Sequence, residues 1–329
     1  MRIVARIIIL LSVMALGNIS DARPVANYFD LTEIGTSAGT IRKGDIQGFS
    51  STATGIFENP ASIYRTYKLS ASAFMTEFME EASYQNIALS MRMPIGVIGL
   101  GVMRLGVDDL YKTKEENGRH VTNGTFNYDN TLYKIAYQVS HSRYLHIGIA
   151  ANLYSTRMDT VKGDGYNIDL GAVFDGENID VSIAMKNIIT SSVINYSDSD
   201  PDPDNNSNGQ IEGLPLISTI GVRYHLKYLG LYGQVKKIGE SQKFVKNFGV
   251  DAKIPFISII EFSGGYREYY KNEVNIERET SEKVIKSATI GVGLDLFGVN
   301  FDYAFEKTMD DNAYSEYQQK HYFSVGLSF

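Results

Sequence analysis

The chain has 329 residues, a formal net charge of −7 and no cysteine, so disulfides, thiol catalysis and thiolate metal sites are excluded. The acidic balance, without a stripe of clustered Lys and Arg, argues against nucleic acid as a partner. With 30 glycines, 7 prolines and 12% aromatic residues, the composition is typical of one large domain with many β-strands.

The first residues have the pattern of a secretory signal peptide. Arg2 and Arg6 supply the positive start, Ile7–Leu16 is the apolar stretch, and small residues precede a cleavage point after Ala22. The apolar stretch is too short for a good membrane-spanning helix, and an uncleaved anchor is the alternative. We therefore predict that residues 1–22 form a signal peptide and that the protein is exported.

Residues 23–67 lack the pattern of membrane-spanning strands. The run Gly48–Gly55 is small and polar, while the rest of the segment holds too many apolar residues for a typical disordered region. We predict that 23–67 forms an N-terminal hatch, or plug, inside the barrel that follows. The alternative is a disordered tail on the periplasmic side.

Residues 68–329 alternate very short and long polar connections between extended segments. Short turns on one rim and long loops on the other are typical of a transmembrane β-barrel of the bacterial outer membrane. The same rule predicts extracellular long loops and periplasmic termini. The predicted fold is all-β, a fourteen-stranded antiparallel barrel with the hatch in its lumen. The predicted strands are 68–78, 83–93, 96–106, 126–140, 144–157, 165–175, 179–190, 214–226, 229–238, 243–254, 257–268, 284–297, 298–307 and 318–329.

Apolar and polar side chains alternate along these strands, as expected when one face meets lipid and the other meets the lumen. The polar face also carries many glycines, and small residues there suit a lumen that another segment must fill. Eight strands can fill their own lumen and sixteen leave an open channel, so fourteen strands need such a filler. The glycines on this face are Gly99, Gly101, Gly148, Gly171, Gly221, Gly291, Gly293 and Gly326.

The third and the last predicted strands carry further signals. Glycines cluster in 96–106, so we predict that this strand kinks and opens sideways into the membrane. At the C-terminus, Phe323, Val325, Leu327 and Phe329 share one face of a final strand. This ending resembles the signal by which the barrel-assembly machinery recognises outer-membrane barrels.

A family resemblance lies in the predicted hatch. Ser37-Ala38-Gly39, Gly48, Ala53–Phe57 and above all Asn59-Pro60-Ala61 resemble the N-terminal signature of the FadL-type superfamily. The resemblance implies a fourteen-stranded barrel whose hatch carries Asn59, Pro60 and Ala61 in a structural or gating role. The simplest physical interpretation of this motif is a rigid turn into the first strand. Two departures are Ile41–Ile46, where the family has a glycine-dense stretch, and Ser62, where it has glycine.

The resemblance implies one of two functions, because the superfamily has two branches. One branch transports fatty acids and aromatic hydrocarbons, which implies passage or binding of hydrophobic small molecules such as fatty acids. The other contains PorV/PorQ-like proteins, which implies a structural component of a type IX-like secretion system that receives cargo proteins on its outer loops. The short chain favours this second branch, whereas the missing cysteine argues against those of its members that are lipoproteins. Expected partners are outer-membrane lipid and either a hydrophobic molecule or a secreted cargo protein.

The sequence gives little sign of catalysis or of a cofactor. Its histidines are scattered over loops and different strands, so we predict no enzyme and no cofactor. The acidic connection Ser197–Gly213 partly matches a calcium loop through Asp204, Asn206, Asn208 and Gly209, but Pro215 replaces the final glutamate. A solvated acidic loop is the preferred interpretation, and no metal is predicted. Charged or polar residues predicted to line the lumen or anchor the hatch are His146, Asp169, Lys186, Arg223, Asp295, Asp302 and Glu306.

Overall fold

The computed structural model describes residues 30–78, 82–116, 119–189, 191–200, 208–239, 244–255, 257–274, 280–309 and 319–329. The predicted signal peptide and the start of the predicted hatch, residues 23–29, lie outside these ranges. Among the described residues, no helix combines the length and the apolar character needed to cross a membrane.

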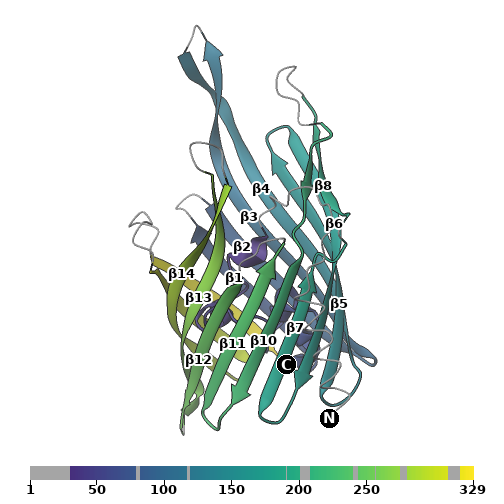
Figure 1. Cartoon of the computed structure of the whole chain (residues 1–329), viewed down its shortest axis with the longest axis vertical. Coiled ribbons are helices and arrows are strands. Elements are labelled where there is room, and N and C mark those ends of the chain that lie inside the picture. The colour runs from purple at the N-terminus through teal and green to yellow at the C-terminus, as the bar shows by residue number, and fades with distance from the viewer. Residues whose placement is uncertain are drawn as a thin grey trace.

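The described residues form a closed antiparallel β-barrel of fourteen strands, as predicted (Figure 1). Each barrel strand pairs with the barrel strands that precede and follow it, and β1 pairs with β16 to close the ring. Two short extra strands, β8 (Val193–Asp198) and β9 (Ile211–Gly213), add to the sheet beside β6. The barrel strands are β1 (Leu69–Phe78), β2 (Ala82–Met93), β3 (Gly96–Glu116), β4 (Arg119–Ser140), β5 (Leu145–Met158), β6 (Val161–Asp175), β7 (Ile179–Lys186), β10 (Ile217–His225), β11 (Leu229–Ile238), β12 (Val245–Ile254), β13 (Ile257–Val274), β14 (Thr280–Leu296), β15 (Val299–Thr308) and β16 (Gln319–Ser328).

Three predicted loops are mostly strand. The connections expected at 107–126, 158–165 and 267–286 are extensions of β3–β4, β5–β6 and β13–β14, which keep pairing far beyond the predicted ends. Polar residues such as Thr113 and Thr122 tolerate strand geometry, and an antiparallel pair already in register can continue without a new turn. As Figure 1 shows, β3 and β4 consequently project well above the rest of the barrel.

The seventh predicted strand, 179–190, is too long. β7 ends at Lys186 because Asn187 adopts a left-handed conformation with φ of 58°, which interrupts the regular ladder. The Asn187 amide instead donates to the Asp169 carboxylate at 3.0 Å, and its side chain donates to the Pro215 carbonyl at 3.0 Å. The wall is therefore irregular between β7 and β8, where local hydrogen bonds replace strand pairing.

The predicted sideways kink in the third strand is wrong. β3 pairs with β2 from Gly96 to Val107 and with β4 from Val97 to Val107 without a change of register. Register shifts occur only beyond Val107. The glycines at 99 and 101 face Ile56 and Phe57, so they leave room for the interior of the barrel and do not bend the strand.

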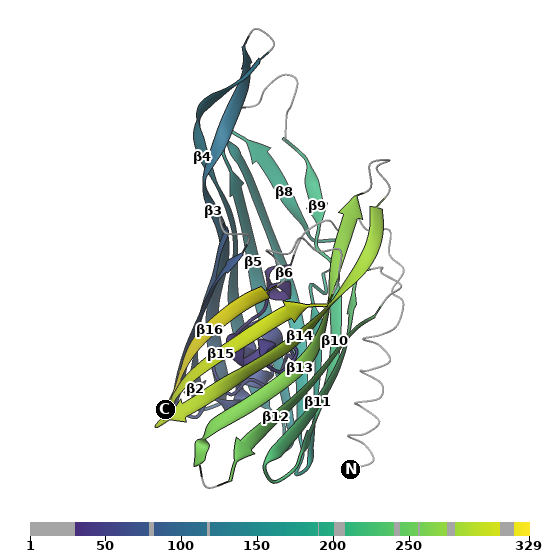
Figure 2. The same ribbon diagram turned by 90° about the vertical axis from the view of Figure 1, so that its left-hand side faces the viewer.

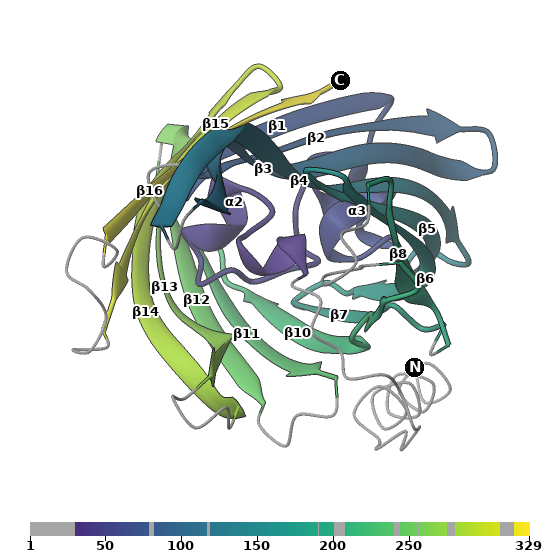
Figure 3. The ribbon, with the colours of Figure 1, turned by 90° about the horizontal axis from the view of Figure 1, so that it is seen from above.

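Residues 30–67, here called the N-terminal segment, lie inside the ring of strands (Figure 3). The segment folds into four short helical turns and is almost entirely buried. Its first turns begin with ordinary caps: the Asp30 carboxylate accepts from the Thr32 amide, and the Ser37 hydroxyl accepts from the Thr40 amide. The turns are η1 (Leu31–Glu33), α2 (Ala38–Ile41), α3 (Gly55–Glu58) and η2 (Ser62–Arg65).

All eight inward glycines named from the sequence face the N-terminal segment. A Cβ added at any of them would lie 3.1 Å or less from an atom of this segment. At Gly171 it would lie 1.8 Å from Asn59 Oδ1, and at Gly148 it would lie 2.4 Å from the Ala61 nitrogen. The glycines thus form the surface on which the segment is seated.

Candidate functional site

The candidate site is the interior of the barrel, where the N-terminal segment meets the wall. Asn59 sits at its centre with no exposed surface. Its side-chain NH₂ donates to Ser182 Oγ at 2.8 Å and to the carbonyl oxygens of Ala172 and Ile183 at 3.2 and 3.1 Å. Its side-chain oxygen accepts from the Ala61 amide at 2.9 Å. Asn59 therefore bonds both its own turn and the β6–β7 wall.

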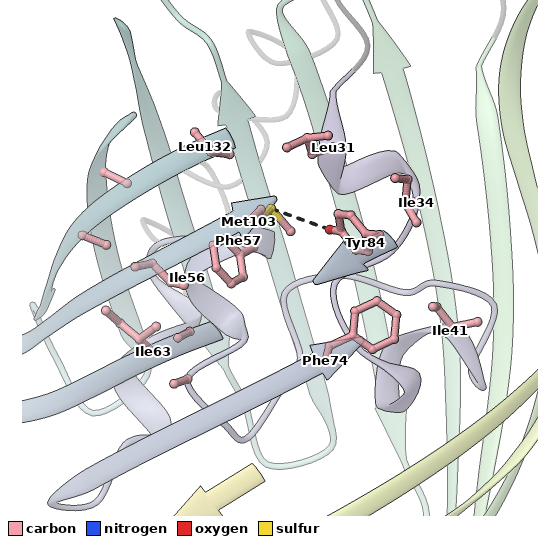
Figure 4. Close-up of a cluster of buried hydrophobic side chains, with 14 of the residues drawn as sticks. Leu31, Ile34, Ile41, Ile56, Phe57, Ile63, Phe74, Tyr84, Met103 and Leu132 are labelled. Carbon is pink, nitrogen blue, oxygen red and sulfur yellow. Dashed lines mark hydrogen bonds between the residues drawn. The ribbon is translucent and has the colours of Figure 1, made fainter. Parts of the chain in front are cut away.

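On the β1–β5 side the contact is apolar. Ile56, Phe57 and Ile63 pack under the inner faces of β3 and β4, beside Met103 and Leu132 (Figure 4). These side chains are all buried.

An aromatic trio continues this cluster toward the closing seam of the barrel. The ring centroid of Phe74 lies 5.8 Å from that of Tyr84 and 6.0 Å from that of Tyr322. The hydroxyls of the two tyrosines are satisfied: Tyr84 donates to the Gly35 carbonyl, and Tyr322 donates to Glu306. The apolar interior therefore reaches the inner side of the β1–β16 seam.

On the opposite side the contact is ionic, and Arg42 makes two of its ion pairs. Its guanidinium donates to Glu261 at 2.5 Å, to Asp302 at 3.1 Å and to Ser263 Oγ at 2.8 Å. Burial opposes the charge, but Asp302 and Glu261 raise the pKa of Arg42 above its ordinary value. One side chain of the segment thus joins β13 and β15.

A second ionic cluster surrounds Asp45. Arg267 lies 3.3 Å from the Asp45 carboxylate and also pairs with Glu306 at 3.1 Å. Lys236 donates to Glu33 at 2.7 Å. No described residue donates a hydrogen bond to either carboxylate oxygen of Asp45, and burial raises the pKa of Asp45 to about 6 although Arg267 and Lys236 favour the ionised form. The cluster ties the segment to β11 and β13.

Four of the residues predicted to line the lumen meet the N-terminal segment. Asp302 pairs with Arg42, and Lys186 donates to Thr32 at 3.0 Å. His146 stacks on Tyr64 with ring centroids 3.6 Å apart. Arg223 lies over the ring of Phe49, and it pairs with Asp180, the carboxylate that also holds Arg65.

The other predicted residues contact side chains of the barrel strands or line a cavity beside them. Asp169 accepts from Lys134, Asn152 and the Asn187 amide, and so supports the irregular end of β7. Glu306 pairs with Arg267. Asp295 lines a cavity near the short connections. Of the calcium pattern, Asp204 and Asn206 lie outside the described residues, and within the described part no group of three or more acidic or histidine side chains is placed to hold a metal.

Sequence reasoning missed Arg42, Asp45, Asp180, Glu261 and Arg267. Arg42 and Asp45 stand in an irregular stretch without periodicity, so no pattern assigns them a direction. Asp180 and Glu261 do alternate with apolar neighbours in their strands, and that alternation is the signal that could have placed them inside, whereas Arg267 stands between Tyr266 and Glu268 and has no such signal.

Two hollows lie in the barrel, and the first of them adjoins the segment. One, of about 440 Å³, lies toward the short connections and is lined by charged groups that include Arg42, Lys43, Arg223 and Asp251. The other is a mainly apolar groove of about 1000 Å³ in the wall at the β1–β16 seam. The groove is lined by outward-facing side chains such as Met75, Phe301 and Phe323 and also by inward-facing ones such as Phe74 and Asn86.

The seam itself is incompletely paired. β1 and β16 pair from Ser70 and Ser328 up to Met75 and Phe323, and there the ladder ends. Beyond this point β1 continues along β2 alone, and β16 continues along β15 alone. Figure 2 shows β15 and β16 slanting across this side and ending low, while β3 and β4 rise far above them. The groove lies where this ladder ends, and beyond that point the Thr76 hydroxyl still donates to the His321 carbonyl at 3.4 Å.

No model of a protein family matches this sequence, and no curated protein matches it. Solved structures do match its fold. They include the toluene transporter TodX of Pseudomonas putida (TM-score 0.54, 10% identity, 93% of this chain and 98% of that chain) and the toluene transporter TbuX of Ralstonia pickettii (0.55, 11%, 89% and 98%). A FadL homologue of Pseudomonas aeruginosa also matches (0.53, 8%, 88% and 97%). At such identities the likeness establishes the fold, which is FadL-type as predicted.

Proposed function

We propose that this chain is an outer-membrane barrel that admits a hydrophobic small molecule and releases it sideways through the β1–β16 seam. The observation that carries the proposal is the apolar groove at the point where pairing between β1 and β16 stops. The FadL-type fold supports it, because the proteins that share this fold include named toluene transporters.

The outward face supports a position in a membrane. Large apolar side chains such as Ile87, Leu89, Ile147, Ile149 and Ile290 are exposed on the outside of the wall. Exposed apolar surface of this extent is unfavourable in water and favourable in lipid, where a closed barrel also pairs every backbone group. We place the short connections in the periplasm and the long ones outside the cell, following the usual asymmetry of such barrels.

The polarity of the two hollows supports the sideways route. A hydrophobic molecule that moved past Arg42, Lys43 and Asp251 toward the short connections would separate or desolvate charged groups, which is costly. A molecule that moved from the aromatic trio into the seam groove would stay in contact with apolar side chains. Phe74 stands between the apolar interior and the groove and would have to move aside.

A disulfide across the seam tests the route, because the chain has no cysteine of its own. Continuing the register of Met75 and Phe323 places Glu77 opposite His321, just beyond the last pair. The double variant E77C/H321C, when oxidised, should slow uptake of radiolabelled toluene and oleate into cells, and a reductant should restore it. The matched control is A71C/L327C, a directly paired couple within the ladder and outside the groove lining, where a disulfide should change nothing.

The outcomes are distinct. If both oxidised variants transport as well as their reduced forms, the seam is not the exit. If neither the wild-type chain nor any variant raises uptake above that of cells without the protein, transport itself is wrong for these two probes.

One observation favours the alternative, a PorV/PorQ-like component that receives secreted proteins. Among the described residues, Asp108–Glu116 of β3 and Arg119–Asn127 of β4 pair only with each other, so this ribbon has two edges with no partner strand in the described part of the chain. Free strand edges can accept an added strand from a partner. Purification in mild detergent separates the two functions: bound apolar small molecules support transport, whereas a stoichiometric exported protein without them supports the alternative.

A further inference from the structure

Four apolar side chains at the short-connection rim are strongly exposed, and they belong to one sector of the barrel. Phe297, in the β14–β15 turn, is 99% exposed; Ile95, in the β2–β3 turn, is 75% exposed. Tyr67, just before β1, is 70% exposed, and Phe329, just after β16, is 56% exposed. In the order of strands around the barrel, these positions are neighbours from β14 to β3.

Phe297 is also conformationally strained. The turn from Leu296 to Val299 has two residues between the paired strands, and both adopt positive φ, 52° at Phe297 and 86° at Gly298. Such turns favour Asn, Asp or Gly at the first position, because a bulky side chain is unfavourable in a left-handed conformation. The fold therefore presents an aromatic ring at a position that neither turn geometry nor packing within the chain explains.

In the opposite sector of the same rim the apolar side chains are less exposed, as with Leu226 (48%) and Tyr228 (44%) of the β10–β11 turn, and one turn is wholly polar. The β6–β7 turn consists of Gly176, Glu177 and Asn178, and Glu177 and Asn178 are exposed. The β4–β5 turn is polar at Ser140, His141, Ser142 and Arg143, and its one aromatic side chain, Tyr144, is 38% exposed, less than any of the four apolar residues of the β14–β3 sector. The sequence therefore gives this rim strongly exposed apolar side chains between β14 and β3 and polar side chains at the β6–β7 turn.

We propose that the short-connection rim between β14 and β3 is inserted into the phospholipid interface, whereas the β6–β7 turn stands in water, so that the barrel is tilted. The patch is continuous with the outward apolar faces of β14 and β16, through Leu296 and Phe329. Aromatic side chains favour the interfacial region of a bilayer. The proposal rests on the proposed location of the barrel in a membrane.

The chain has no tryptophan, so a single introduced tryptophan reports its own surroundings. Three variants are compared in vesicles of phosphatidylcholine whose acyl chains are brominated, which quenches tryptophan in contact with them. F297W probes the apolar rim, and E177W is the matched control on the polar rim. F301W, at an exposed outward position of β15, tests whether the wall is in the membrane at all.

We expect blue-shifted, strongly quenched emission from F297W and F301W, and water-like, unquenched emission from E177W. Quenching of F301W without quenching of F297W would overturn the inserted rim and leave the membrane barrel intact. Equal quenching of F297W and E177W would overturn the tilt. Absence of quenching in F301W would instead refute the membrane location on which the proposal rests.

Discussion

The N-terminal segment touches the barrel in two chemically different ways. Against β1–β5 it buries Ile56, Phe57 and Ile63 among apolar side chains and inward glycines. Every ion pair that it makes with other described residues goes to β7, β11, β13 or β15, through Glu33, Arg42, Lys43, Asp45 and Arg65. One side of the N-terminal segment is thus a hydrophobic core and the other is a mostly buried salt-bridge network.

The two kinds of contact have different effects: one holds the N-terminal segment in the barrel, and the other fixes its position there. Apolar burial is non-directional and stabilises contact on the β1–β5 side. Buried ion pairs add little net stability compared with apolar packing, but they fix geometry and are costly to break singly. We infer that the apolar side keeps the segment in the barrel and that the ionic side sets its exact position. A rearrangement of the N-terminal segment would therefore exchange partners on the ionic side first.

The largest expected effect is on the apolar side. F57A should lower the free energy of unfolding by about 4 kcal/mol, because it leaves a cavity under β3 where Phe57 now contacts Gly101. F57L should cost less, since leucine keeps much of the buried volume. Urea titrations of the folded barrel in micelles, with and without added salt, measure both. Losses below about 1 kcal/mol for F57A would show that this side does not hold the segment.

On the ionic side, R42A should lower the free energy of unfolding by about 3 kcal/mol, because the partly buried Asp302 would lose the Arg42 cation and Glu261 would keep only its longer pairs to Lys43 and Lys253, at 3.9 and 4.0 Å. The triple variant R42M/E261Q/D302N removes the cation and both carboxylates together and should recover most of that loss. The same titrations test this contrast. If the triple variant is as unstable as R42A, the network contributes stability of its own, and the division between the two sides fails.

The barrel could be predicted because its signals are periodic. Alternating faces such as Leu145–Leu153 and the short turns between strands repeat many times, so single errors do not matter. The errors fall where pairing overrides local polarity, as in Asp108–Glu116, or where one residue breaks a strand, as at Asn187. Neither has a periodic signature.

The N-terminal segment could be predicted only in outline. The inward glycines indicated that something fills the lumen, yet they could not identify which atoms do so. Arg42 and Asp302 are separated by 260 residues, and their contact depends on the closed ring of strands. The seam groove likewise depends on where β1 and β16 stop pairing, and both strands continue beyond that point, so no strand boundary marks it in the sequence.

The smallest expected effect concerns the inward glycines on which the N-terminal segment is seated. G171A should lower the free energy of unfolding by about 2 kcal/mol, because the new Cβ would displace Asn59 from its hydrogen bonds to Ser182 and Ile183. G233A is the matched control: it is also a strand glycine, but the nearest heavy atom to its added Cβ is 4.0 Å away. It should be neutral or slightly stabilising, since alanine loses less backbone entropy on folding. If G171A proves as harmless as G233A, Asn59 is not held by a fixed wall, and the segment moves more freely between its apolar and ionic sides than these contacts indicate.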